Sequence, residues 1–148
     1  MKLKAVVLGV SVMVLAACAA PPSKAPLPAD LKVEAPSDSL APDIKALSGK
    51  WTGRWINSQT QLDHTLVVEK IDASKATLVY SVGEPTSSYV NITPQWRRVT
   101  ATVSPGTLEF KFPNGAAVVY KLQANGSLAG TYTSQGFNTA ATLTRAPA

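Results

Sequence analysis

Between residues 51 and 143 the sequence alternates between apolar and other side chains with a period of two. Side chains on a β-strand point in turn to the two faces of a sheet, whereas apolar positions on a helix recur every three to four residues. The alternation therefore predicts an all-β protein. The expected strands cover residues 51–56, 62–69, 76–82, 95–103, 108–112, 116–122, 128–132 and 137–143.

Turn-forming residues separate these segments. Asn-Gly pairs at 114–115 and 125–126, and glycines at 106 and 136, suit tight hairpins that need a positive φ. A meander of eight strands that closes on itself has no exposed edge. We therefore expect an eight-stranded antiparallel up-and-down barrel, with an open half-barrel or a two-sheet sandwich as the alternative.

The N-terminal segment has the pattern of an export signal. Lys2 and Lys4 precede an apolar segment, residues 5–17, which is too short to span a bilayer as a permanent helix. It ends in Leu15-Ala16-Ala17-Cys18, which resembles the lipobox of bacterial lipoproteins. The resemblance implies a signal peptide over 1–17, cleavage before Cys18 and acylation of that cysteine. An ordinary secretory signal with a chance cysteine is the alternative.

The residues after Cys18 bear on location. Three acyl chains would anchor the protein stably. Ala19 and Ala20 follow, with no aspartate to suggest retention at the inner membrane, so we expect the bacterial outer membrane, facing the periplasm. Loss of Lys2 and Lys4 lowers the net charge from +5 to +3. The basic residues are scattered, so we expect no nucleic-acid binding.

Prolines recur throughout residues 19–42. At this density they prevent a helix, and few large apolar residues are present that could pack. We expect a flexible linker over 18–42, able to reach about 70 Å if fully extended as polyproline II, and a folded domain over 43–148. A segment that orders on contact with a partner is the alternative.

The start of the folded domain carries a family resemblance. A helical turn over 43–47 followed by Gly49 and Trp51 resembles the opening of lipocalins and other calycins. The resemblance implies that the tryptophan plugs the closed end of a barrel and that an arginine from the last strand packs across it. Arg145 stands where that arginine is expected. Residues 126–132 also resemble a Gly-Thr-Tyr strand of avidins, but there the strand lies near the start of the barrel.

His64 is the only histidine, so a metal site with several histidines is excluded. It shares the phase of Leu62 and Leu66 and should point inward, as a hydrogen-bonded core residue or as a polar ligand contact. Asp63 faces the opposite side of the strand and cannot orient it. Since a Gly-x-Ser-x-Gly elbow is also missing, we expect no catalytic residues, no metal and no cofactor.

The open end of the barrel should contain the ligand contacts. The gap at 83–94 is long enough to form a lid over a site, or to be a simple connector. Arg97 and Arg98 point to opposite faces, to form salt bridges or to bind an anionic ligand. Bulky inward residues predict a mostly filled interior with a small cleft at the open end. The candidate ligand residues are His64, Tyr80, Tyr89, Trp96 and Arg98.

Three functional hypotheses follow. The first is non-enzymatic binding of a small apolar or aromatic ligand, or of an envelope component, at the barrel mouth. The second is a protein-interaction role, such as inhibition of a periplasmic hydrolase. The sequence is similar to small barrel-shaped metalloprotease inhibitors in size, export and barrel pattern, but lacks their paired cysteines, and residues 35–46 would enter the protease. The third is a structural envelope lipoprotein without a ligand.

Overall fold

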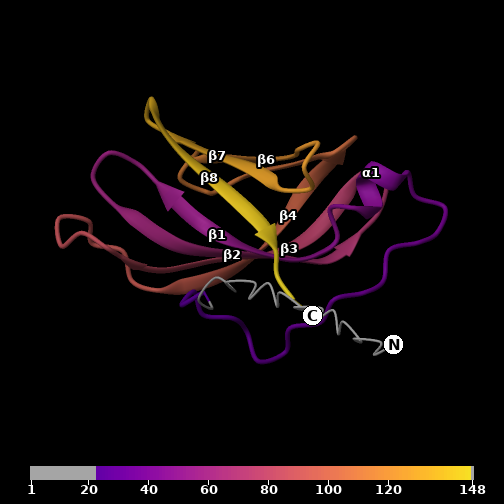
Figure 1. Ribbon diagram of the computed structural model, residues 1–148, viewed down its shortest axis with the longest axis horizontal. Helices are drawn as coiled ribbons and strands as arrows, with labels where there is room; N and C mark the ends of the chain where they lie inside the picture. The colour runs from indigo at the N-terminus through magenta and orange to yellow at the C-terminus, as the bar shows by residue number, and fades with distance from the viewer. Residues whose placement is uncertain (1–22, 148) are drawn as a thin grey trace, which may run out of the picture.

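Every alternating segment forms a strand in the computed structural model, which describes residues 23–147. A short helix, α1 (Pro42–Lys45), precedes them. Strands adjacent in sequence pair antiparallel, and β8 pairs with β1, so the barrel closes (Figure 1). This confirms the predicted up-and-down barrel and excludes the half-barrel and the sandwich. The strands are β1 (Gly49–Ile56), β2 (Gln61–Ile71), β3 (Lys75–Pro85), β4 (Gln95–Ser104), β5 (Thr107–Lys111), β6 (Ala117–Leu122), β7 (Leu128–Ser134) and β8 (Phe137–Arg145).

The Asn-Gly pairs form turns as expected. Gly115 and Gly126 have φ values of 84° and 82°, in the region that favours glycine. The side chains of Asn114 and Asn125 each accept a hydrogen bond of 3.1 Å from the backbone N–H two residues later. These local bonds set the turn geometry and hold the strand registers.

Trp51 and Arg145 seal one end of the barrel, which we call the closed end. Trp51 is fully buried, and its indole N–H donates to the Leu47 carbonyl at 3.0 Å. The Arg145 guanidinium lies 4.2 Å from the Trp51 ring centroid and donates to the carbonyls of Ser48 and Ala46. The arrangement is the one that the calycin resemblance implied for these two residues. The β1–β2, β3–β4, β5–β6 and β7–β8 connections lie at the opposite, open end (Figure 1).

Residues 23–34, which we call the strap, run along the outside of β2 and β3 (Figure 1). By register, Val67 and Val79 form an outward-facing pair, yet both are fully buried. The strap contacts the barrel on either side of this pair. Towards the open end the Ser81 hydroxyl donates to the Pro26 carbonyl, and towards the closed end the Lys32 N–H donates to the Glu69 carboxylate. The strap therefore covers an apolar part of the outer wall.

Polar contacts fix the path of the strap. Glu69 accepts from the Glu34 N–H through its carbonyl at 2.7 Å and forms an ion pair of 2.7 Å with Arg98 through its side chain. Arg98 also pairs with Asp30 of the strap at 2.9 Å. The hydrogen bonds from Arg98 hold the pKa of Glu69 below its usual value. The sequence predicted a flexible linker over 18–42; in its described part, the strap instead follows a defined path, because barrel side chains bind its backbone.

Replacing Arg145 with methionine should lower the free energy of unfolding by about 2 kcal/mol, because the cation–π contact and two hydrogen bonds to carbonyls are lost. Urea unfolding followed by circular dichroism measures this. Arg54→Met is the control: its ion pair with Asp63 is half exposed and should contribute less than about 1 kcal/mol. Equal losses in the two variants would show that Arg145 does not seal the barrel.

Candidate functional site

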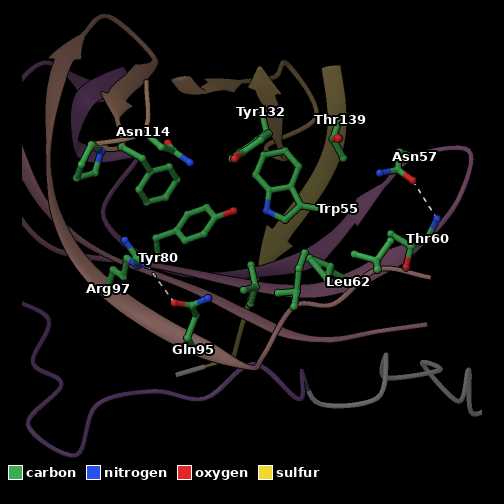
Figure 2. A pocket seen from close by; sticks show the side chains of 15 residues that line it. Trp55, Asn57, Thr60, Leu62, Tyr80, Gln95, Arg97, Asn114, Tyr132 and Thr139 are labelled. Atoms are coloured by element: carbon green, nitrogen blue, oxygen red, sulfur yellow. Dashed lines mark hydrogen bonds between the residues drawn. The ribbon is translucent and has the colours of Figure 1, made fainter. Parts of the chain in front are cut away.

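A cavity of about 530 Å³ occupies the open end of the barrel (Figure 2). The sequence predicted a mostly filled interior with a small cleft at this end; the place is as predicted, and the structure differs in the size of the opening. Near the mouth the inward positions carry short side chains such as Thr60, Val82 and Thr139, which do not reach across the barrel. The lining residues are Trp55, Asn57, Thr60, Leu62, Tyr80, Val82, Val90, Ile92, Gln95, Arg97, Phe112, Pro113, Asn114, Tyr132 and Thr139.

Aromatic rings form much of the cavity wall. The ring of Trp55 lies 6.5 Å from that of Tyr80 and 6.2 Å from that of Tyr132, while Phe112 lies 5.2 Å from Tyr80, all between ring centroids. Gly130 makes room for the indole, since a Cβ atom at this position would lie 3.0 Å from the Trp55 ring. Rings at these separations and tilts pack favourably. The aromatic part of the wall is therefore held by its own packing, and polar side chains such as Asn57, Gln95 and Asn114 complete the lining.

Three polar atoms lie within this aromatic wall. The indole N–H of Trp55 is buried and makes no hydrogen bond within residues 23–147. The hydroxyls of Tyr80 and Tyr132 point towards the same part of the cavity (Figure 2). Burial raises the pKa of Tyr80, so its hydroxyl stays protonated and can donate. The indole N–H opposes this rise in pKa, so it lies against the Tyr80 hydroxyl, and the two tyrosine hydroxyls are the groups that can meet an acceptor on a ligand.

His64 lies beneath the cavity and does not line it. Its Nδ1 is 2.7 Å from the Ser81 carbonyl and its Nε2 is 2.7 Å from the Tyr120 hydroxyl. A carbonyl only accepts, so Nδ1 carries the proton and Nε2 accepts from Tyr120. Burial lowers the pKa of His64 to about 4, against the opposing effect of the Ser81 carbonyl. The imidazole is thus neutral near pH 7, and both of its nitrogens are hydrogen-bonded. Of the two predictions for His64, this is the hydrogen-bonded core residue and not the ligand contact.

The other candidate residues are divided between the cavity and the outer surface. Tyr80 lines the cavity, whereas Tyr89 is 96% exposed and Trp96 is on the outer face of β4. Arg98 also faces outward, to the strap. Arg97 lines the cavity and was missing from the predicted set. Every second residue of β4 faces inward, and counting back from the inward-facing Val103 leads to Arg97. The alternation in the sequence could therefore have placed Arg97, and not Arg98, inside the barrel.

Residues 35–46, which the inhibitor hypothesis assigned to a protease cleft, lead into the closed end. Ile44 is 7% exposed within the core, and Leu40 packs against the same core. The carbonyl of Ala46 accepts from Arg145. In the structure the second half of this segment is built into the closed end, whereas most residues from 35 to 42 are exposed.

Several predicted features lie beyond this site. The signal peptide and Cys18 are outside the described residues. Among residues 23–147, no cluster of three or more histidine, cysteine, aspartate or glutamate side chains could hold a metal ion. Over the same range, no helix is long and apolar enough to cross a membrane. No protein-family model matches the sequence, and no curated protein matches it. Membership of the calycins therefore stays a prediction.

The burial of neutral His64 predicts a specific pH dependence. Between pH 6.5 and about 4 the unfolded chain binds a proton at His64 that the folded protein does not, so stability falls as the pH is lowered through this window. The full loss is about 3 kcal/mol. Because His64 is the only histidine, its ring resonances can be followed unambiguously by NMR. They should remain those of neutral imidazole down to about pH 4. A titration midpoint near 6.5, the ordinary pKa of histidine, would contradict the burial of a neutral His64.

Proposed function

We propose that this chain is a lipid-anchored envelope lipoprotein whose barrel binds a small, mainly apolar or aromatic ligand carrying an anionic group. The observation that supports this is the cavity at the open end: its wall is aromatic and aliphatic, and Arg97 is the one charged residue in its lining. The role is binding without catalysis. The lipobox pattern at Cys18 supports the anchor, which we place in the outer membrane, facing the periplasm.

The size of the cavity supports a small organic ligand. Its volume of about 530 Å³ lies within the range of small-molecule sites. An apolar or aromatic ligand would replace the water that otherwise contacts Trp55, Phe112 and Tyr132. Burial of apolar surface on both partners is then the main source of affinity.

Arg97 supplies the preference for an anion. Its guanidinium lies 5.9 Å from the Phe112 ring centroid and donates to the Gln95 side chain at 3.4 Å. These two contacts orient it at the mouth, and it forms no ion pair within residues 23–147. A guanidinium that is held in place and has free donors matches a carboxylate or a phosphate oxygen pair.

The deeper polar atoms define the other end of the ligand. The hydroxyls of Tyr80 and Tyr132 can donate to one acceptor within the aromatic wall, beside the indole of Trp55. The best fit is therefore an apolar body with an acceptor near Trp55 and an anionic group near Arg97. Either of these contacts would fix the orientation of the ligand.

Paired ligands that differ only in charge test this proposal. We expect 2-naphthoate and dodecanoate to bind more tightly than 2-naphthol and dodecanol, with Arg97→Met reducing the affinity of the carboxylates about tenfold and leaving the alcohols unchanged. Isothermal titration calorimetry measures both. Arg54→Met is the matched control, because Arg54 faces the outer surface and pairs with Asp63.

A second variant tests the place of binding. Ile92→Trp adds bulk to a half-buried residue of the β3–β4 loop in the cavity wall and should abolish binding of all four compounds. Thermal unfolding confirms that the variant remains folded. Binding that is equal for acids and alcohols, and insensitive to both substitutions, would refute the proposed site.

A further inference from the structure

The large apolar side chains exposed to solvent gather at the open end of the barrel. Ile56 ends β1, Phe137 begins β8, Trp96 is the second residue of β4, and Tyr89 lies in the β3–β4 loop. Their exposures are 50%, 78%, 40% and 96%. Among residues 23–147 only Val33 is exposed in the same way elsewhere. We call these four residues the rim.

The strap also begins near this end. The Lys24 N–H donates to Asp63 at 2.9 Å, and the Thr65 hydroxyl donates to the Ser23 hydroxyl at 3.0 Å. Asp63 is the third residue of β2, whose first residue, Gln61, lies at the open end. Towards higher residue numbers the strap leads to Glu69 and the closed end. The chain therefore enters the described structure near the rim.

We propose that the rim rests on the bilayer surface to which Cys18 is anchored, so that the cavity mouth faces the lipid. This inference rests on the lipid anchor of the proposed function. Tyrosine, tryptophan and phenylalanine side chains are favourable at the boundary between headgroups and acyl chains. The acyl chains on Cys18 bring the rim to that boundary, and the rim residues fix which end of the barrel meets it.

The length of the tether supports this orientation. The five Cα–Cα steps from Cys18 to Ser23 span at most about 17 Å. From Asp63 to Ile71, β2 continues for roughly 26 Å towards the closed end. The tether is shorter than this distance, so the anchor can reach the level of the rim but not the closed end. A free linker over 18–42 would impose no such preference.

The open end carries a small positive excess, so electrostatic attraction to anionic lipid adds to docking without being its main contribution. Lys24, Arg54, Arg97 and Lys111 are found here together with Asp63 and Glu84. Docking should therefore depend on the acyl anchor and the aromatic side chains, and only weakly on the fraction of anionic lipid. In this orientation Arg97 is at the headgroup level, where an anionic amphiphile presents its charged group.

Fluorophores at the two ends of the barrel test the orientation. The full acylated chain, with either Ser88→Cys in the β3–β4 loop or Ala124→Cys in the β6–β7 turn at the closed end, is labelled with NBD. It is then reconstituted into phosphatidylethanolamine–phosphatidylglycerol vesicles that contain nitroxide lipids. Both positions are exposed, which makes them a matched pair. We expect the Ser88→Cys label to lose most of its fluorescence and the Ala124→Cys label to lose little.

A rim variant tests whether the exposed aromatic side chains cause this orientation. Tyr89→Ser combined with Phe137→Ser should strongly reduce quenching of the Ser88→Cys label, while the protein stays acylated and folded. Equal quenching at the two ends, or stronger quenching of the Ala124→Cys label, would overturn the orientation. Mass spectrometry of the N-terminal peptide reports acylation, and calorimetry in detergent reports ligand binding. An unmodified Cys18 would refute the anchor and the orientation together, whereas an acylated chain with the wrong label quenched refutes only the orientation.

Discussion

The ladder between β1 and β8 runs from Trp51 opposite Arg145 to Ile56 opposite Ala140, and it turns the meander into a barrel. The strands approach so closely at Gly53 that a Cβ atom there would lie 2.2 Å from the Thr142 carbonyl. Trp51 and Trp55 lie on the same face of β1, four residues apart. One therefore plugs the closed end while the other forms part of the cavity wall. The plug and the site are positioned by a single strand.

Ser81 links the interior of the barrel to the strap. Its carbonyl accepts from His64 in the core, and its hydroxyl donates to the Pro26 carbonyl outside. His64 in turn accepts from Tyr120, whose ring is nearly parallel to the imidazole at a centroid distance of 5.9 Å. Satisfied polar networks in a core rigidify it and favour one arrangement of side chains. Through this network, the strap on the outside of the barrel is linked to the side chains beneath the cavity, and each stabilises the position of the other.

The strands could be predicted from the sequence because alternation and turn-forming residues are local properties of the chain. The same alternation placed His64 and Tyr80 inside. Arg97 was missed because the two adjacent arginines could be assigned only after the inward phase of β4 was counted from Val103. The cleft at the open end was predicted but its size was not, because the size depends on how far short side chains from different strands reach across the barrel. That distance is set by tertiary structure.

The strap illustrates how a proline-rich segment can be misread. Its composition is that of a linker, with too few large apolar residues to form a core of its own. However, Val67 and Val79 in the outward phase of β2 and β3 are apolar on a face where the alternation predicts polar side chains. A fully exposed valine pair on neighbouring strands would favour association with another chain. Covering that pair with the strap removes this exposed surface. Since the same segment follows Cys18 in sequence, the cover also determines from which end of the barrel the proposed lipid tether would leave.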